Sequence, residues 1–171
     1  MLRGETVYLR ALEPEDLDLL YTWENDTDLW QVSNTLVPFS RKLLKEYLEQ
    51  TQLDIYASKQ LRMVICLNNE KAIGFIDLFD FDPSNLRAGI GILIGDKTER
   101  NQGHAADALK TLQVYCKEKL NLHQLYCSIA ADNIASRTLF EKNNFVSTGL
   151  KKDWQRSGAS FIDEYFFQCI L

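Results

Sequence analysis

The fold is decided by residues 88–119, AGIGILIGDKTERNQGHAADALKTLQVYCKEK. The segment opens with Ala88–Ile94, which is apolar along its whole length and is therefore typical of a strand covered on both faces. Residues 95–102 follow as a polar turn. The apolar residues beyond the turn recur at offsets of 3, 4, 7 and 11, as on one face of a helix: Ala105, Ala108, Leu109, Leu112 and Cys116. We therefore expect a buried strand, a turn and an amphipathic helix in succession.

The hexapeptide Arg100–Ala105 lies at the start of this expected helix. The first N–H groups of a helix lack intrahelical acceptors and lie at the positive end of its dipole, so they form a site for a phosphate group. Gly103 has no Cβ, which permits a ligand to approach closely, and Ala105 adds little bulk. In the alternative interpretation, Gly103 only breaks a loop and Ala105 only packs in the core.

Two segments carry a resemblance to a known family. Arg100–Ala105 resembles the (Q/R)xxGx(G/A) signature of the GNAT superfamily of N-acetyltransferases, whose corresponding amides bind the pyrophosphate of acetyl-CoA. Asn133–Ser136, followed by 139–145 (LFEKNNF), is similar to the NxxA/S…LY/FxxxGF segment of that family. Asn133 and Ser136 also fit simple capping of a helix, a role that is compatible with contact to a bound pantetheine. Residues 9–26 resemble the branch that contains ribosomal-protein N-terminal acetylases and spermidine acetyltransferases.

The resemblance implies a GNAT-like α/β (α+β) fold. Its central sheet would be mixed and mostly antiparallel, with six to seven strands, helices on both faces and a splayed pair of parallel strands at 88–94 and 124–130. The gap between these two strands would admit the pantetheine arm of acetyl-CoA. The cofactor-binding residues that the resemblance implies are Ile92, Leu93, Ile94, Arg100, Asn101, Gln102, Gly103, His104, Ala105, Asn133, Ser136 and Phe140.

The implied activity is acetyl transfer from acetyl-CoA to a primary amine by direct attack within a ternary complex. The acceptor would be a peptide N-terminus or a small polyamine-like molecule. Two residues depart from the family pattern, because Phe140 replaces a frequent tyrosine acid and Gly89 replaces a frequent glutamate base. Ser136 is then the best candidate for a catalytic hydroxyl, as at the corresponding place in N-terminal acetylases. Alternatively the thiolate leaves unprotonated, since the pKa of a thiol lies near 8.5.

Several further side chains are candidates for the acceptor site. A water held by a carboxylate is one possible base, and the acidic candidates are Asp77, Asp80, Asp82 and Asp153. The aromatic candidates for shaping the site are Trp30, Phe39 and Trp154. For the acidic residues the alternative is a solvated surface charge, and for the aromatic residues it is packing in the core or in a lid.

The length and charge of the chain restrict the classes of function. A chain of 171 residues with 46% hydrophobic content is expected to form one domain, 1–171. The formal net charge of −5 disfavours a nucleic-acid partner, which would require clustered Lys and Arg, and it suits a cationic substrate better. We expect either a monomer or a homodimer.

The cysteines and the N-terminus bear on metals and location. Four cysteines lie far apart with only two histidines in the chain, so we expect buried reduced thiols and no metal site. The first residues, MLRGETVYLRAL, lack a signal-peptide pattern, and no window approaches the roughly 18 to 20 apolar residues of a membrane span. A cytoplasmic protein without a membrane partner is expected.

The remaining elements follow from periodicity and from turn residues. We expect a helix that has Pro14 in its first turn, a loop over 25–39 and a helix from an N-cap at Ser40 to about Gln52. The other expected elements are strands at 5–12, 61–67, 72–79, 124–130, 145–148 and 161–170, a turn at 80–85 and a helix at 133–143.

Two competing functions are compatible with the sequence. A non-catalytic acyl-CoA binding or sensing module is suggested by Phe140 and Gly89, which replace the usual acid and base. A nucleotide-binding domain of another fold is less well supported, because the chain contains neither GxGxxG nor GxxxxGK[ST].

Overall fold

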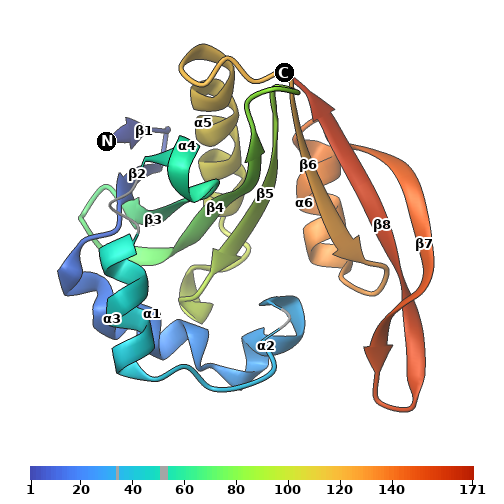
Figure 1. Ribbon diagram of the computed structural model, residues 1–171, viewed down its shortest axis with the longest axis horizontal. Helices are drawn as coiled ribbons and strands as arrows, with labels where there is room; N and C mark the ends of the chain where they lie inside the picture. The colour runs from blue at the N-terminus through green and yellow to red at the C-terminus, as the bar shows by residue number, and fades with distance from the viewer. Residues whose placement is uncertain (34, 51–53) are drawn as a thin grey trace.

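An eight-stranded sheet forms the centre of the computed structural model, which describes residues 1–33, 35–50 and 54–171 (Figure 1). Only β5 and β6 are parallel among the neighbouring strands of this described sheet, and the other neighbours are antiparallel. In spatial order the strands are β1 (Leu2–Arg3), β2 (Val7–Ala11), β3 (Leu61–Leu67), β4 (Ala72–Asp82), β5 (Arg87–Ile94), β6 (Gln124–Ala130), β8 (Ser160–Ile170) and β7 (Val146–Ser157).

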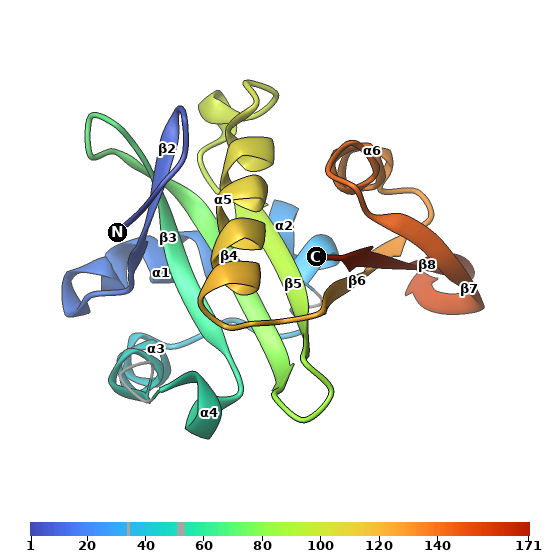
Figure 2. The same ribbon diagram turned by 90° about the horizontal axis from the view of Figure 1, so that it is seen from above.

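Helices cover both faces of the sheet. Figure 2 shows α5 (His104–Glu118) and α6 (Ile134–Lys142) on one face, with α1 (Leu17–Glu24) and α3 (Arg41–Gln50) on the other. Short helical segments complete the described chain: η1 (Pro14–Asp16), α2 (Thr27–Ser33), α4 (Ile55–Ser58) and η2 (Lys97–Glu99).

Two hydrophobic cores correspond to these two faces. The α5 face buries four of the five residues of the helical stripe expected from the sequence, Ala108, Leu109, Leu112 and Cys116, together with Phe140 of α6. The fifth, Ala105, is half-buried. The opposite face buries Leu20 and Trp23 of α1 and Leu44 of α3 against Phe75 of β4. Trp23 and Phe75 meet edge to face, with ring centroids 4.9 Å apart. The sheet is therefore fixed from both sides.

The structure confirms the expected fold class, including the mixed, mostly antiparallel sheet and the parallel pair. The sheet has eight strands instead of six to seven. The additional strand is β1, which has two residues and pairs Leu2 with Leu9 and Arg3 with Tyr8. A strand this short has too few residues to show an alternating pattern.

Three sequence expectations need correction. The expected loop at 25–39 contains the short helix α2, in which Leu29 is buried. The expected turn at 80–85 begins too early, because β4 continues to Asp82 through a bulge at Asp80, where φ is 49°. The strand expected at 145–148 extends to Ser157, and its almost wholly exposed side chains hide the alternation.

Two helices near the middle of the chain are α3 and α4. Ser40 caps α3 as expected, since its Oγ accepts a hydrogen bond from the Leu43 amide at 3.1 Å. The expected end of this helix near Gln52 lies outside the described residues. The structure adds α4, which the sequence analysis did not predict, and Asp54 caps it by accepting from the amides of Tyr56 and Ala57. None of the described helices has the length and apolar character required to cross a bilayer.

Candidate functional site

The parallel strands β5 and β6 part soon after they meet. They pair at Arg87 with Gln124, at Ala88 with Leu125 and at Gly89 with Tyr126, and beyond these pairs each strand is bonded only to its other neighbour. Figure 1 shows the two ribbons close together near the chain's C-terminus and diverging away from it. The splayed pair expected from the sequence is therefore present.

A cleft of about 720 Å³ occupies this gap. Its walls come from both faces of the sheet, because residues of α6 and residues of α1, β3 and β4 line it together. We call it the through-sheet cleft. Its backbone walls are Ile90–Leu93 of β5 and Cys127–Ala130 of β6, the stretches that lack a partner across the gap. Two molecules entering from opposite faces can therefore meet inside it.

Three of the expected residues line the α6 side of the cleft. Asn133, Ser136 and Phe140 fall at offsets of 3 and 7, which places them along one face of the helix. Asn133 is the N-cap, and its Oδ1 accepts from the Ser136 amide at 3.1 Å. Phe140 is 4% exposed and meets Phe145 edge to face, with centroids 4.9 Å apart. Of the three expected β5 residues, Ile92 and Leu93 line the cleft and Ile94 does not.

The expected anion cradle, Arg100–Ala105, stands at the start of α5 and does not line the cleft. Gly103 is the N-cap and has a φ of +87°, and a Cβ built there would meet no atom within 4 Å. Asn101 is left-handed as well, with a φ of 62°. The first hydrogen bond within α5 runs from the Asp107 amide to the Gly103 carbonyl, so the amides of residues 104–106 precede it.

The side chains of the cradle point to nearby groups of the protein. Gln102 Nε2 donates to the Thr98 carbonyl at 2.8 Å, and His104 Nδ1 lies 3.3 Å from Thr6 Oγ1. Arg100 Nε donates to the Ile94 carbonyl at 3.0 Å, which ties the cradle to the end of β5. The terminal Nη2 of Arg100 is buried without a hydrogen-bond partner. The open helical amides at the start of α5 fit an anionic group such as a diphosphate.

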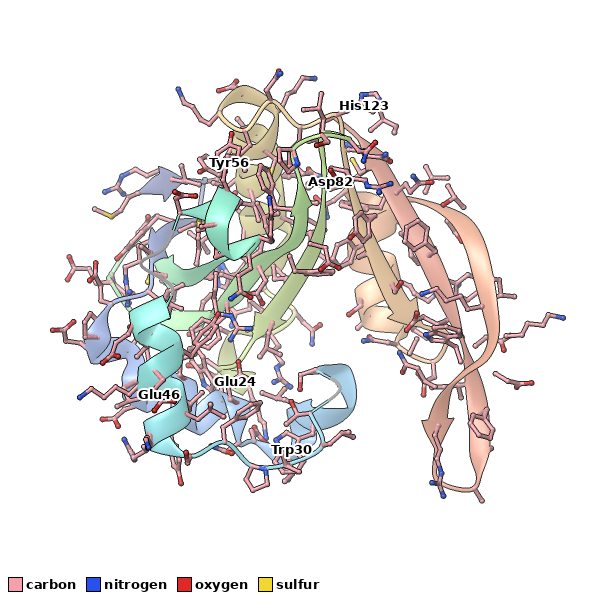
Figure 3. All side chains as sticks on the ribbon, viewed as in Figure 1. Glu24, Trp30, Glu46, Tyr56, Asp82 and His123 are labelled. Atoms are coloured by element: carbon pink, nitrogen blue, oxygen red, sulfur yellow. The ribbon has the colours of Figure 1, made fainter. Side chains whose placement is uncertain are left out.

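The opposite side of the cleft carries charges that the sequence did not bring together. Arg62 of β3 donates through Nε and Nη2 to the two oxygens of Asp77, at 2.6 and 3.1 Å, and through Nη1 to Glu24. Arg62 also lies over the Phe75 ring, 5.4 Å from its centroid. Burial alone would lower the pKa of Arg62, but the Asp77 carboxylate outweighs burial and raises it. Glu24 projects from α1 (Figure 3).

The third wall comes from the β7–β8 hairpin. Glu164 is 5% exposed, and its two oxygens accept from Lys151 Nζ at 2.7 Å and from Gln155 Nε2 at 2.6 Å. Lys151 also donates to Ser128 of β6 at 3.1 Å. The charged residues lining the cleft are four carboxylates (Glu24, Asp77, Asp132, Glu164) and one arginine (Arg62). Carboxylates therefore outnumber cationic side chains along the lining of the cleft.

A family model described as "Acetyltransferase (GNAT) domain" matches residues 6–146. The chain belongs to the GNAT family of acetyltransferases. It is therefore an acyltransferase, and its acyl donor is acetyl-CoA, as in the family.

Relatives of known sequence are N-acetyltransferases of Bacillus. The chain is 26% identical over 171 residues to "Uncharacterized N-acetyltransferase p20" of Bacillus licheniformis, covering 99% of this chain and 95% of that protein. It is 25% identical over 161 residues to "Probable N-acetyltransferase YjcK" of Bacillus subtilis (strain 168), covering 89% and 87%.

Solved structures share the fold of this GNAT protein. Spermidine N-acetyltransferase from Vibrio cholerae in complex with CoA and spermine superposes with a TM-score of 0.87 at 22% identity, covering 96% of this chain and 95% of that one. A chimera of the Vibrio cholerae enzyme SpeG and hSSAT gives a TM-score of 0.84, also at 22% identity, and covers 97% and 96%.

The departure from the GNAT pattern at Gly89 has a physical cause. A Cβ at this position would lie 2.1 Å from Cε2 of Phe79, so the Phe79 ring occupies the space that a glutamate side chain would need. Phe79 stacks edge to face with Tyr126, which in turn lies beside Phe166, with centroids 6.1 and 5.6 Å apart. An aromatic row therefore closes the point where β5 and β6 part.

The candidate acids and aromatics for the GNAT acceptor site divide into three groups. Asp77 and Phe39 line the through-sheet cleft, whereas Asp80 and Asp82 line a separate hollow that Tyr126 borders as well. Three others lie elsewhere: Asp153 is exposed, Trp154 is 60% exposed over Lys151, and Trp30 donates from Nε1 to the Glu24 carbonyl. Figure 3 shows Asp82 toward the end of the sheet where β5 and β6 pair, and Glu24 toward the opposite end.

The four cysteines are free and buried. Cys127 lines the cleft, and burial raises the pKa of its thiol to about 12. Burial also raises the pKa of Cys116 to about 12. Within the described residues, no group of three or more His, Cys, Asp or Glu side chains is placed to hold a metal ion.

Proposed function

We propose that the chain transfers the acetyl group of acetyl-CoA to a primary amine of a small cationic acceptor, by direct attack within a ternary complex. The observation that carries this proposal is the through-sheet cleft, whose two sides differ in charge. One side presents backbone and the neutral face of α6, and the other presents Glu24 and Asp77 around Arg62. The donor and the acceptor then enter from opposite faces of the sheet.

The residues proposed to hold acetyl-CoA come from three elements. The edge of β5 that lacks a partner across the gap pairs with the pantetheine arm at Ile92–Ile94, in the manner of an added strand. The amides of Arg100–Ala105 bind the diphosphate. Asn133, Ser136 and Phe140 contact the arm from α6. Acetyl-CoA supplies the acetyl group and a thiolate that can leave.

The protein's own groups orient the reaction. Backbone amides at the end of β5 polarise the carbonyl that the acceptor nitrogen attacks. Ser136 is proposed to relay to the departing sulfur the proton that the attacking amine loses, because its side chain lies on the cleft face of α6. If that proton transfer matters, Ser136→Ala lowers kcat by about a hundredfold or more, a much larger change than it makes in the KM for acetyl-CoA. An unchanged kcat would mean that the thiolate leaves unprotonated.

The acidic side of the cleft supports a polyamine-like acceptor in preference to a peptide N-terminus. A second protonated nitrogen of such an acceptor is stabilised by Glu24 and Asp77, which exceed Arg62 by one formal charge. The solved structure of a Vibrio cholerae spermidine N-acetyltransferase with CoA and spermine gives a parallel in the same fold.

Thiol release from acetyl-CoA across an amine panel tests the proposal. The panel contains spermidine, a monoamine and a peptide with a free N-terminus, and we expect the highest kcat/KM with spermidine. CoA binding without turnover on any amine would instead indicate an acyl-CoA sensing module.

The variant Gly103→Glu places a carboxylate in the cradle and is expected to weaken CoA binding by at least about a hundredfold, roughly 2.7 kcal/mol. Gly158→Glu is the matched control, because Gly158 also has a positive φ, +62°, and no atom within 4 Å of a built Cβ. Equal CoA affinity in the two variants would contradict the proposed cradle.

We also infer that residues 1–171 form one domain. The support is that strands between Leu2 and Ile170 belong to one sheet. A single cooperative unfolding transition, seen at the same denaturant concentration by fluorescence and circular dichroism, is the expected result.

A further inference from the structure

Asp107 occupies the first turn of α5, close to the cradle, yet its carboxylate is bound to the N-terminal turn of the chain. Oδ1 accepts from the Glu5 amide at 3.0 Å. Oδ2 accepts from the amides of Thr6 and Val7, at 2.7 and 3.0 Å, and from Thr6 Oγ1 at 3.0 Å. Four donors from consecutive residues therefore converge on one carboxylate, about a hundred residues away in the sequence.

The N-terminal turn is shaped around this carboxylate. The Gly4 amide donates to the Val7 carbonyl at 2.8 Å and closes the turn. A Cβ at Gly4 would lie 2.6 Å from both Asp107 oxygens and 2.7 Å from Thr111 Oγ1, so the close approach requires a glycine. Burial would raise the pKa of Asp107, but the hydrogen bonds from the backbone amides outweigh it and lower the pKa. The carboxylate is held in its charged form.

The N-terminal turn also contacts the cradle, through Thr6 and His104. Thr6 Oγ1 lies 3.3 Å from His104 Nδ1, and His104 Nε2 lies 3.5 Å from Glu99 Oε2. Glu99 Oε1 accepts from Lys71 Nζ at 2.8 Å, and Lys71 also pairs with Asp96 at 2.8 Å. The segment 96–107 is thus held on one side by the β3–β4 turn and on the other by the N-terminal turn.

We propose that Asp107 is a positioning residue that sets the direction of the α5 amides toward the diphosphate of acetyl-CoA. The inference rests on the proposed function in so far as the cradle binds that diphosphate. Hydrogen bonds weaken steeply as their angle departs from linearity, so a small rotation of the first turn reduces several amide contacts at once. Asp107 acts on the amides and does not touch the ligand.

The direction in which Asp107→Asn changes the affinity for CoA distinguishes a positioning role from a purely electrostatic one. A carboxylate in the first helical turn repels a phosphate, so if charge dominated, Asp107→Asn would tighten CoA binding. If positioning dominates, the same substitution weakens binding, because the Asn NH₂ group faces amide donors and only one carbonyl oxygen remains to accept. Asn has nearly the same size as Asp, so packing changes little.

The experiment measures the affinity for CoA and for pantetheine, which lacks the diphosphate, by calorimetry on the full chain. Asp107→Asn alters the contact between Asp107 and the N-terminal turn on the helix side, and Gly4→Ala alters it on the side of the turn. Each variant is expected to bind CoA about tenfold more weakly, or by roughly 1.4 kcal/mol. Pantetheine binding is expected to change less than about twofold. In steady-state kinetics the KM for acetyl-CoA rises while kcat and the KM for the amine stay constant.

Leu44→Ala is the control for a purely structural effect, because Leu44 is 4% exposed in the core on the other face of the sheet. It is expected to lower the melting temperature without changing the ratio of CoA to pantetheine affinity. The proposal is overturned if Asp107→Asn and Gly4→Ala lower the melting temperature but leave that ratio unchanged, or if CoA binds more tightly. If the wild-type protein binds pantetheine and CoA with equal affinity, both the proposed cradle and the role of Asp107 are wrong. If the wild type prefers CoA and both variants keep the same preference, only the role of Asp107 is wrong.

Discussion

The two sides of the through-sheet cleft are built in different ways. The side proposed for acetyl-CoA uses short contiguous segments, namely the end of β5 and the first turns of α6, and the cradle at the start of α5 lies outside the cleft. The side proposed for the amine uses single side chains from α1, β3, β4 and the β7–β8 hairpin. Backbone geometry therefore determines the first side, and side-chain chemistry determines the second. A substitution on the amine side can change the acceptor while the donor site stays intact.

The largest effect on stability is expected at the point where the two sides meet. Gly89→Glu introduces the family's frequent base, but its Cβ lies 2.1 Å from the Phe79 ring. Overpacking of this kind costs about 3 kcal/mol, which urea unfolding measures as a lower midpoint. Gly91→Ala is the control, since its Cβ lies 3.9 Å from Phe79, and it is expected to change stability by less than about 1 kcal/mol. Adding Phe79→Ala to Gly89→Glu should recover part of the loss; no recovery would rule out the Phe79 clash as the cause.

A smaller effect is expected from the amine side. Arg62→Met leaves Glu24 and Asp77 without their shared cation, and because the Arg62 side chain is 23% exposed, the cost is about 2 kcal/mol, below that of a fully buried pair. The KM for the amine should change and the affinity for CoA should not. Arg41→Met removes an exposed pair with Asp18 and should cost less than about 1 kcal/mol. Equal losses in these two variants would show that burial of the Arg62 pair contributes nothing.

The next largest loss of stability is expected on the side of the cleft proposed for acetyl-CoA. Asn133→Ala removes the N-cap of α6 and should cost about 1 kcal/mol, while Asn133→Asp keeps an acceptor oxygen and should cost less. Chemical unfolding measures both values. The KM for acetyl-CoA should rise with Asn133→Ala, since the cap orients the cleft face of α6. A rise in the KM for the amine alone would mean that α6 serves the other side of the cleft.

The smallest expected effect is the labelling of Cys127 by thiol reagents. Burial raises the pKa of Cys127 to about 12, so near pH 8 only about one molecule in 10⁴ carries the thiolate. Iodoacetamide should therefore leave the native protein unlabelled at this residue, and mass spectrometry after proteolysis shows the outcome. Denatured protein should label at all four cysteines. Rapid labelling of native Cys127 would show that the gap opens far wider than the structure indicates.

The elements that form the side proposed for acetyl-CoA could be predicted from the sequence, because they depend on local patterns. The buried strand, the left-handed Gly103 and the capping Asn133 each belong to one segment, and each has a recognisable residue type. The contacts of the bound donor stay a prediction.

The amine side could not be predicted from the sequence in the same way. Arg62 and Asp77 are 15 positions apart and become partners only through the register of β3 and β4. Glu164 acquires Lys151 and Gln155 through a hairpin whose first strand shows no apolar alternation. Asp77 was one of four equivalent acidic candidates, and tertiary structure alone placed it in the cleft.

The three residue pairs between β5 and β6 form the only ladder joining two parts of the described sheet, β1–β5 and β6–β8. A ligand that hydrogen-bonds to β5 where β5 has no partner across the gap fills the space between the two parts of the sheet. Its binding free energy then adds to the free energy of unfolding. By thermodynamic linkage, saturation at a hundred times the dissociation constant stabilises the native state by about 2.7 kcal/mol. The melting temperature should therefore rise with the concentration of acetyl-CoA. Amide hydrogen exchange should slow most in the stretch of β5 that faces the gap.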